Sequence, residues 1–300
     1  MISIVIPVFN EEDNLDELNS RLSVVCESLD DNYEIIYVDD SSSDNSLEII
    51  KKYCSSNEHI HYISFYRNFG QHAAVMAGFK YTCGEIIITL DADLQNPPEE
   101  IPKFLEKMKE GFDVVAGKRV NRKDKLSRII PSYFINKFIS SLTGVKLNDY
   151  GCMMRAYRRD IINKLLQYGE KSLYITAFTS WLSQNTIEIP IKHDSRFAGN
   201  SKYSLLSLLR QVFDLVTTYS LVPIQLIGII GFVLFVVGIF LFLYLMYHRM
   251  FIAHLDPLTS FIAILIFLSG VILFSIGIVS EYLVRLYKEV RSIPLYILKE

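Results

Sequence analysis

Short apolar runs alternate with amphipathic segments through the first part of the chain. Runs such as Ile2–Val8 and Tyr33–Val38 are rich in β-branched residues, which predicts buried strands. Apolar residues at helical spacing, such as Leu15, Leu18 and Leu22, predict helices between these runs. We expect strands at about 2–8, 33–38, 61–65, 86–90 and 113–116, separated by helices at about 11–29, 46–54, 71–82 and 98–110. This order predicts an α/β domain with a parallel sheet and helices on both faces.

Polar residues follow each of the first four expected strands. They are Asn10 and Glu11, Asp39 and Asp40, Arg67 and Asn68, and Asp91 and Asp93. Turn chemistry alone can explain any one of these pairs. The carboxyl ends of parallel strands meet at one edge of the sheet, and ligands of open α/β sheets bind there. Four polar pairs at one edge therefore favour a binding site.

The fourth strand is followed by two carboxylates and an amide at alternate positions, Asp91, Asp93 and Gln95. Such oxygen ligands suit Mg²⁺ or Mn²⁺, which bind through one or two carboxylates plus substrate phosphates. The alternative is that an aspartate caps the helix that begins near Pro98. The chain has no G-x-G-x-x-G after the first strand and no G-x-x-x-x-G-K-[ST], which argues against a dinucleotide dehydrogenase and a P-loop NTPase. A phosphate site without a glycine-rich loop needs a metal, and this D-x-D motif can hold one.

A basic cluster and an amphipathic segment come next. Apolar residues recur at helical spacing over about 126–142, directly after the cluster that begins at Lys118. One interpretation is a core-facing helix with solvated lysines. The other is a helix lying in a membrane interface, with its basic residues toward anionic head groups. We expect a second such helix at about 203–219, after a polar segment, 193–202, that suits an anionic group.

Two long runs, Leu221–Tyr247 and Pro257–Ser280, contain no charged residue. Each exceeds the roughly 20 residues that cross a bilayer core. We therefore expect a cytosolic domain over 1–220, a hairpin of two transmembrane helices within 221–284, and a tail over 285–300. Lysines and arginines flank the outer ends of the hairpin, which places both termini in the cytoplasm by the positive-inside rule. Glycines within the runs would permit close helix packing.

Composition limits the classes of function. The net charge of −3 gives no global basic signature, so we expect no nucleic-acid partner. The four cysteines are widely spaced and form no C-x-x-C pair, which argues against zinc or a disulfide framework and fits a reducing compartment. The N-terminus lacks the features of a signal peptide, so we expect the soluble part to stay in the cytosol.

A metal-competent edge on a domain tied to a bilayer suits transfer from a soluble, phosphate-bearing donor to a lipid-borne acceptor. A metal there would neutralise a leaving diphosphate. Asp39 and Asp40 can accept hydrogen bonds from a base or a ribose. The basic residues near the membrane can hold a lipid phosphate.

Five motifs resemble those of the polyprenyl-phosphate glycosyltransferases, the group of glycosyltransferase family 2 that includes dolichyl-phosphate mannose synthase. They are PVFNEE (7–12), VDDSSSD (38–44), RNFGQ (67–71), LDADLQNPPEEIP (90–102) and RFAGNSKYS (196–204). The resemblance spans almost the whole chain and includes the tail, 280–296. The segment DYGCMMRAYRRDI (149–161) is most similar to the branch that transfers an aminosugar, 4-deoxy-4-formamido-L-arabinose, for lipid A and lipopolysaccharide modification, which serves antibiotic resistance.

The resemblance implies a GT-A (Rossmann-like) fold, a UDP-sugar donor, undecaprenyl phosphate as acceptor and an inverting single displacement. It implies a uridine site made by Pro7, Asn10, Glu11, Asp39, Asp40 and Asp91. It implies Mg²⁺ or Mn²⁺ held by Asp91, Asp93 and Gln95. It assigns lipid-phosphate and diphosphate contacts to Arg119, Arg122, Arg128, Ser132, Arg196, Ser201 and Lys202. It also implies a multi-pass protein of the bacterial inner membrane that forms a homo-tetramer.

The candidate catalytic residues are Asp149 and Asp93. Many relatives carry a second acidic residue just after the glycine of the 149–155 segment, where this chain has Cys152 and Met153. Asp149 is therefore the only carboxylate there, either as a base or as a cap of the turn before Gly151. The acceptor phosphate is already ionised at pH 7, so positioning and charge neutralisation should provide most of the rate enhancement.

Three alternatives accompany this hypothesis. Glucose, N-acetylhexosamine and galactosamine donors present the same diphosphate as formamido-arabinose, so the sugar is left open. A processive polysaccharide synthase would carry Q-x-x-R-W, whereas the sole tryptophan, Trp181, lies in TSWLSQ. A membrane module that binds a nucleotide sugar without catalysis is the alternative from another class, and the intact D-x-D-x-Q argues against it.

Overall fold

The structure is a computed structural model that forms two compact units. It describes residues 1–29, 31–120, 140, 144–168, 175–183, 185–194, 222–251, 257–290 and 295–299. The first unit contains Met1–Ser204 and Pro294–Glu300, and the second contains Leu205–Ile293. The two expected interface helices, 126–142 and 203–219, lie outside the described residues apart from Ser140.

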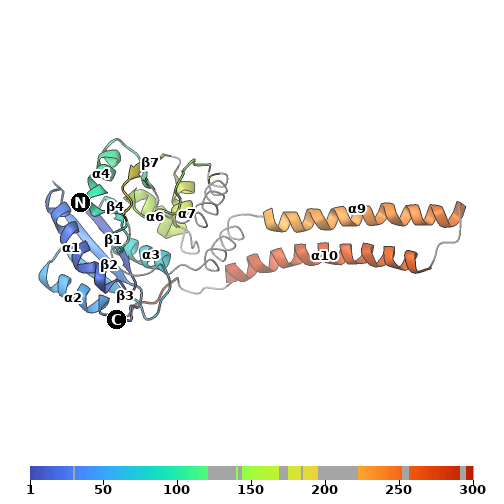
Figure 1. Ribbon diagram of the computed structural model, residues 1–300, viewed down its shortest axis with the longest axis horizontal. Helices are drawn as coiled ribbons and strands as arrows, with labels where there is room; N and C mark the ends of the chain where they lie inside the picture. The colour runs from blue at the N-terminus through green and yellow to red at the C-terminus, as the bar shows by residue number, and fades with distance from the viewer. Residues whose placement is uncertain are drawn as a thin grey trace. The chain divides into compact units, whose positions relative to one another are not determined.

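The first unit has the predicted alternation of strands and helices (Figure 1). Its strands are β1 (Ile2–Val8), β2 (Tyr33–Asp39), β3 (Ile60–Ser64), β4 (Ile86–Thr89), β5 (Val114–Arg119), β6 (Arg155–Arg158) and β7 (Thr186–Ile191). Its helices are α1 (Glu12–Glu27), α2 (Ser46–Ser56), α3 (Gln71–Tyr81), the 3₁₀ helix η1 (Pro98–Glu100), α4 (Ile101–Lys109), α6 (Arg159–Tyr168) and α7 (Ile175–Leu182).

The sheet has the strand order β3-β2-β1-β4-β6-β5-β7 and is mixed. Strands β1 to β4 pair in parallel, as expected. The expectation of a wholly parallel sheet is wrong, because β6 lies antiparallel between β4 and β5. This strand has only four residues and an arginine at each end, so its sequence lacks the long apolar run by which the other strands were predicted.

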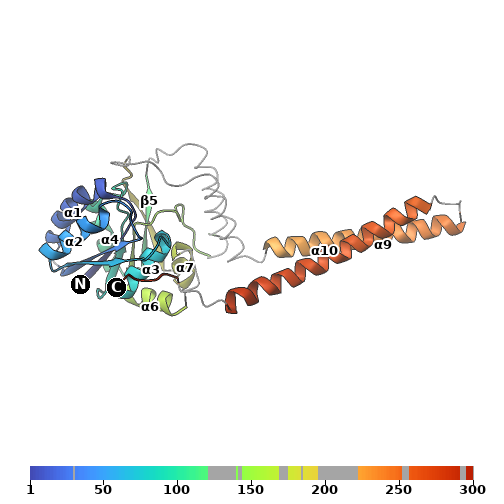
Figure 2. The same ribbon diagram turned by 90° about the horizontal axis from the view of Figure 1, so that it is seen from below.

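Helices cover both faces of the sheet and produce a core on each side (Figures 1 and 2). Alternate residues of a strand point to opposite faces. Accordingly, Ile4 and Ile6 of β1 pack with α1, α2 and α4, whereas Val5 packs with α3, α6 and α7. Because both faces are buried, the strands need apolar residues at nearly every position, which explains the continuous runs in the sequence.

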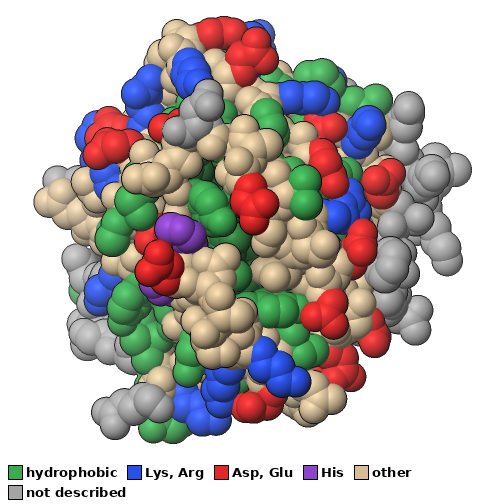
Figure 3. Space-filling view, turned by 90° about the vertical axis from the view of Figure 1, so that its left-hand side faces the viewer, with side chains coloured by type: hydrophobic (Ala, Val, Ile, Leu, Met, Phe, Trp, Pro, Cys, Tyr) green, Lys and Arg blue, Asp and Glu red, His purple; other side chains and the backbone are tan. Residues whose placement is uncertain are grey.

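The surface of the first unit carries mixed charge. On the face in Figure 3, acidic and basic side chains are interspersed, and hydrophobic side chains line a hollow near its centre. The mixture agrees with the small net charge of −3.

The second unit contains two long helices that pack side by side, α9 (Val222–Phe251) and α10 (Pro257–Val290) (Figures 1 and 2). Within the described residues, one stretch, Gly231–His248, is long and apolar enough to cross a membrane. The apolar stretch found in α10, Phe267–Ser280, is shorter. Of the two expected transmembrane helices, only the first therefore has a described stretch that is long and apolar enough to cross a membrane.

Two glycines of α9 lie directly against phenylalanines of α10. A Cβ atom on Gly231 would lie 2.7 Å from Cβ of Phe274, and one on Gly238 would lie 2.9 Å from Cδ2 of Phe267. Neither glycine has room for a side chain. The glycines thus let the two helices approach closely, as small residues do at interfaces between transmembrane helices.

We predict that Gly238→Leu disrupts this helix pair, because a leucine side chain has no space against Phe267. Overpacking of this kind costs roughly 1–3 kcal/mol. Thermal unfolding of the detergent-solubilised protein should show a lower melting temperature. Val237→Leu is the matched control, because Val237 is 53% exposed. Equal melting temperatures for Gly238→Leu and the control would contradict the packing described here.

Candidate functional site

The polar ends of β1, β2 and β4 converge at one edge of the sheet. Strand β1 pairs with β2 on one side and with β4 on the other, all in parallel. The pairing continues past the strands, because the amide of Asp40 donates to Val8 O (2.8 Å) and that of Leu90 to Val5 O (3.1 Å). The order reverses at β1, which makes this edge the switch point where open α/β sheets bind ligands.

The loops after β1 and β2 are joined by hydrogen bonds. Oδ1 of Asn10 accepts from the amide of Ser43 (2.7 Å), and the amide of Asn10 donates to Oγ of Ser42 (3.0 Å). The amide of Glu11 donates to Oγ of Ser46 (2.9 Å). Pro7 lies in β1 opposite Val38 of β2. The predicted uridine-binding residues of β1 are therefore in one ordered group with the β2 loop.

Asp39 and Asp40 are buried, with exposed fractions of 1% and 3%. Asp39 accepts hydrogen bonds from the amide of Ser42 (3.1 Å) and from Oγ of Ser64 (2.9 Å). Asp40 accepts from the amides of Phe69 (2.7 Å) and Gly70 (2.8 Å), one at each carboxylate oxygen. The two aspartates therefore hold the loops that follow β2 and β3 at this edge through hydrogen bonds. A carboxylate has about four lone-pair positions, so each retains capacity to accept from a ligand.

The carboxyl group of Asp40 is electrostatically perturbed. Burial raises its pKa above the ordinary aspartate value, and the hydrogen bonds from Phe69 and Gly70 offset part of that increase because they favour the ionised form. Gly70 has a φ angle of 95°, in the region that favours glycine. The hydrogen bonds to Asp40 and the positive φ angle of Gly70 thus both help to define the conformation of the loop before α3.

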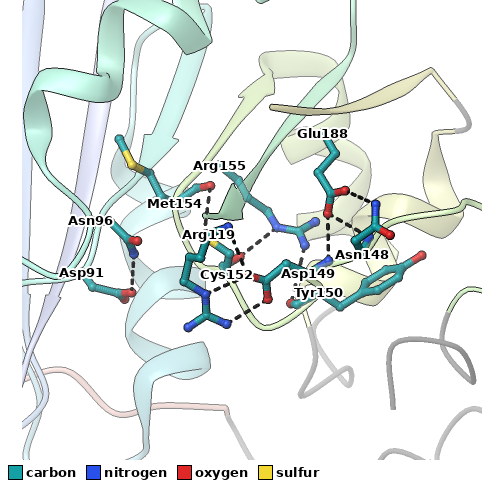
Figure 4. Close-up of polar contacts among 10 residues, drawn as sticks. All are labelled: Asp91, Asn96, Arg119, Asn148, Asp149, Tyr150, Cys152, Met154, Arg155 and Glu188. Carbon is teal, nitrogen blue, oxygen red and sulfur yellow. Dashed lines mark hydrogen bonds and ion pairs between the residues drawn. The ribbon is translucent and has the colours of Figure 1, made fainter. Parts of the chain in front are cut away.

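Asp91 and Asp93 follow β4 at the same edge. Nε2 of Gln71 donates to Oδ1 of Asp91. Figure 4 shows the second contact of this carboxylate, in which Nδ2 of Asn96 lies 3.5 Å from Oδ2 of Asp91. The amide of Gln95 donates to Oδ1 of Asp93 (3.2 Å). The capping alternative is wrong, since the residue before η1 is Pro97 and no side chain caps that helix.

The chemistry at the end of β4 is that of an oxygen-ligand site. No cluster of three or more His, Cys, Asp and Glu side chains able to hold a metal occurs among the described residues. The polar groups beside the carboxylates of Asp91 and Asp93 instead include amides, from Gln71, Gln95 and Asn96. Oδ1 of Asn96 is buried and has no hydrogen-bond partner within the described part of the chain. These groups suit a cation that takes its other ligands from water and substrate phosphates.

Arg119 and Asp149 form a two-point ion pair. Nε and Nη2 of Arg119 lie 2.7 Å and 2.8 Å from the two carboxylate oxygens of Asp149 (Figure 4). The Asp149 side chain is only 4% exposed, so the pair is shielded from water. Such planar, charge-assisted pairs are strong and directional. Asp149 therefore orients Arg119 in this structure.

The antiparallel strand β6 explains how Asp149 reaches the edge. Arg155, its first residue, pairs with Thr89, the last residue of β4, so the preceding segment emerges at the carboxyl end of the parallel strands. Glu188 of β7 accepts hydrogen bonds from the amides of Asn148 and Asp149, both at 2.8 Å. Arg155 is fully buried and donates to carbonyl groups of this segment, among them that of Cys152 (3.1 Å).

Cys152 is not a nucleophile in this arrangement. Its side chain is buried, and burial raises the pKa of the thiol to about 12. The thiol is therefore neutral at physiological pH, and a neutral thiol is a poor nucleophile.

Four residues that take part in these networks were missed from the sequence: Gln71, Asn96, Arg155 and Glu188. The first two lie in motifs that were recognised, next to Gly70 and Gln95, and only their partner was unknown. Arg155 also lies in a recognised segment, 149–161, whereas Glu188 does not; the contacts of both depend on the pairing of β6 and β7 with distant parts of the sheet, which the sequence does not reveal.

The remaining predicted contacts to the lipid phosphate lie outside the described residues. They are Arg122, Arg128, Ser132, Arg196, Ser201 and Lys202.

Comparisons with known proteins agree on one class. A family model described as "Glycosyl transferase family 2" matches residues 3–166. An undecaprenyl-phosphate 4-deoxy-4-formamido-L-arabinose transferase of Proteus mirabilis (strain HI4320) is 41% identical over 303 aligned residues, covering 100% of this chain and 93% of the relative. One of the same name from Salmonella choleraesuis (strain SC-B67) is 42% identical, with the same coverage.

Among solved structures, the fold is similar to glucosyl-3-phosphoglycerate synthase from Mycobacterium tuberculosis. That protein, in complex with Mn²⁺, UDP and glucosyl-3-phosphoglycerate, has a TM-score of 0.54 and 20% sequence identity, and the match covers 73% of this chain and 80% of that one. At this identity the likeness establishes the fold, a GT-A type α/β domain.

We predict that Asp40→Asn destabilises the first unit. An amide side chain can accept from only one of the two backbone N–H groups that Asp40 now satisfies, and it turns its own NH₂ toward the other. Leaving a buried donor unsatisfied costs about 1–3 kcal/mol. Denaturant unfolding measures the change, with Glu58→Gln, a substitution at an exposed position, as the control. Unfolding midpoints that do not differ between the two variants would refute this role of Asp40.

Proposed function

The chain belongs to glycosyltransferase family 2, and we propose that it transfers a sugar from a UDP-sugar to undecaprenyl phosphate with inversion of configuration. The observation that carries this proposal is the 41% identity, over the whole chain, to the Proteus mirabilis undecaprenyl-phosphate transferase. The site supports it, because carboxylates and amides of the types expected to bind a nucleotide and a metal gather at one edge of a GT-A type sheet.

In this proposal the donor binds along the ends of β1, β2 and β4. Pro7, Asn10 and Glu11 contact the uridine from one side, and Asp39 and Asp40 from the other. The hydrogen bonds between Asn10 and Ser43 support the assignment, because they hold the two loops in one position before the donor arrives. Such preorganisation reduces the free-energy cost of ordering the site on binding.

A divalent cation, Mg²⁺ or Mn²⁺, would be held by Asp91, Asp93 and Gln95. The residues present fit it, since two carboxylates lie at the strand end and the buried Oδ1 of Asn96 lacks a partner among the described residues. When bound, the cation supplies charge neutralisation for the leaving diphosphate. Gln71 and Asn96 act on Asp91 by holding its carboxylate in one orientation.

In the reaction, a phosphate oxygen of the acceptor attacks the anomeric carbon, the bond from that carbon to the diphosphate breaks, and UDP leaves. The attacking oxygen is already ionised, so the reaction needs no strong base. Arg119 lies at the same edge and is oriented by Asp149, so its guanidinium can offset phosphate charge there. Asp149 then serves as a positioning residue and Arg119 as the contact to phosphate.

We assign α9 and α10 to the inner membrane of a bacterium as a hairpin with both termini in the cytoplasm. Many of their large apolar side chains are exposed, for example Phe240 at 67% and Leu273 at 58%. Apolar surface of this extent on a helix pair needs a lipid or protein cover. The lipid acceptor is reached from the same bilayer, with Arg122, Arg128, Ser132, Arg196, Ser201 and Lys202 as contacts to its phosphate. The proposed assembly is a homo-tetramer.

The proposed sugar is an aminosugar such as 4-deoxy-4-formamido-L-arabinose, which serves lipid A modification. The relatives' names and the segment 149–161 support this choice over glucose, N-acetylhexosamine or galactosamine. A panel of UDP-sugars incubated with the protein and undecaprenyl phosphate, with mass spectrometry of the lipid product, tests both the reaction and the sugar. Absence of any lipid-linked sugar with every donor would instead favour a nucleotide-sugar-binding module without catalysis.

We predict that transfer needs a divalent cation and Asp93. Chelation should abolish transfer, and Mg²⁺ or Mn²⁺ should restore it. Asp93→Asn should lower kcat/KM by roughly 10²-fold or more, because charge neutralisation of the leaving group is lost. Glu106→Gln, an exposed position on α4, is the control and should leave turnover unchanged. Full activity in the presence of a chelator would exclude the metal site.

We predict that Asp149→Asn lowers kcat by roughly ten-fold or more and leaves UDP affinity unchanged, because Arg119 loses the charged partner that orients it. Steady-state kinetics with undecaprenyl phosphate and equilibrium titration with UDP separate the two quantities. Asp160→Asn, on the exposed side of α6, is the control. If turnover is unaffected in the lipid-acceptor assay, Asp149 has no role in the reaction.

A further inference from the structure

The end of the chain adds a short strand to the open edge of the sheet. Leu298 forms an antiparallel bridge with Phe65, just beyond β3, which is the edge strand. The amide of Tyr66 donates to Ile297 O (3.2 Å), and the amide of Lys299 donates to Ser64 O (2.8 Å). Figure 1 shows the C-terminus beside β3. Addition of an extended segment to a free sheet edge is a common mode of peptide recognition.

Side chains make this docking specific. The ring of Tyr296 stacks on that of Phe65, with centroids 5.2 Å apart and planes 10° apart. Leu295 and Leu298 pack against the same core cluster as α3, whereas Ile297 is 48% exposed. The tail, residues 295–299, thus has partly buried and exposed side chains, so its register on β3 is defined.

Two of the three residues that pair with the tail, Ser64 and Phe65, also contact the proposed donor site. Oγ of Ser64 donates to Oδ2 of Asp39 (2.9 Å), and the amide of Phe65 donates to the carbonyl oxygen of Asp39 (3.0 Å). The ring of Phe65 meets that of Phe69 edge-on, with centroids 5.7 Å apart. Phe65 is therefore held between the tail on one side and Phe69 on the other.

From Phe69 the contacts continue to the metal-binding carboxylate. The amides of Phe69 and Gly70 donate to Asp40, and the side chain of the next residue, Gln71, donates to Asp91. A displacement of Phe69 would therefore alter the hydrogen bonds of both Asp40 and Asp91. The segment 65–71 connects the tail to the nucleotide and metal residues through an unbroken series of contacts.

We propose that the C-terminal tail is a positioning element of the donor site, in which Tyr296, stacked on Phe65, holds the segment 65–71 in the conformation that binds the nucleotide diphosphate. The main-chain hydrogen bonds of the tail lie at the edge strand and at this one segment, so hydrogen exchange at the segment separates this role from global stabilisation. This role rests on the proposed function in that the ligand at the strand ends is a nucleotide diphosphate with its metal.

The test uses the full-length protein in detergent and three variants: Tyr296→Ala, Tyr296→Phe and Ile297→Ala. Tyr296→Phe keeps the stacked ring, and Ile297→Ala changes an exposed side chain of the same tail. Amide hydrogen exchange followed by mass spectrometry reports on the segment 65–71 without any ligand. Titration with UDP in the presence of Mn²⁺ reports on donor binding.

We expect Tyr296→Ala to accelerate exchange at Phe69 and Gly70, to leave β1 and α1 unchanged, and to weaken UDP binding by roughly five-fold. In turnover assays KM for the donor should rise by a similar factor with kcat nearly constant. Tyr296→Phe should restore wild-type exchange and affinity, and Ile297→Ala should match wild type in both.

Two outcomes would overturn the inference. Unchanged exchange at Phe69 and Gly70 in Tyr296→Ala would show that the tail does not position this segment, and uniformly faster exchange across β1, β2 and β4 would show a general stabilising role. A wild-type protein that binds no UDP would overturn the proposed function instead, and the exchange of the 65–71 segment would still decide the role of the tail.

Discussion

The parallel pairing of β1 with both β2 and β4 is the constraint on which the rest of the structure depends. It brings the ends of three strands and the loops after them to one edge, and these carry the carboxylates of Asp39, Asp40, Asp91 and Asp93. Placing several carboxylates at one edge is unfavourable unless hydrogen-bond donors or cations neutralise them. Backbone amides do so for Asp40 and side-chain amides for Asp91, which leaves a role for a cation at the end of β4.

The same constraint explains why the polar networks are long. Asp40 holds the loop before α3, Gln71 of that helix holds Asp91, and the C-terminal tail holds Phe65 at the start of the same segment. On the other side of β4, the antiparallel β6 brings Asp149 to Arg119, and Glu188 fixes the turn that carries Asp149. Asp40, Asp91 and Asp149 are thus each held by at least one partner distant in sequence.

The sequence was sufficient for everything that depends on local pattern. Runs such as Ile2–Val8 and helical spacing such as Leu15–Leu18–Leu22 give the elements and, with the parallel order, the convergence at one edge. The sequence was insufficient where a contact between distant parts of the chain determines the structure. Strand β6 forms because β4 and β5 leave a place for it, and an isolated Arg-Ala-Tyr-Arg has no strand signature. In the same way, the sequence suggested Asp149 as a base or a turn cap, and nothing in it indicated that Arg119 would pair with both of its carboxylate oxygens.

The central claim is that the end of β4, beside the ends of β1 and β2, holds the metal and diphosphate of a UDP-sugar. An experimental structure of the full-length protein with UDP and Mn²⁺, with the metal located by anomalous scattering, tests it most directly. We expect a manganese peak within coordination distance of Asp93, the diphosphate on that metal, and the uracil between the loops after β1 and β2. Manganese and UDP bound elsewhere on the protein would contradict it.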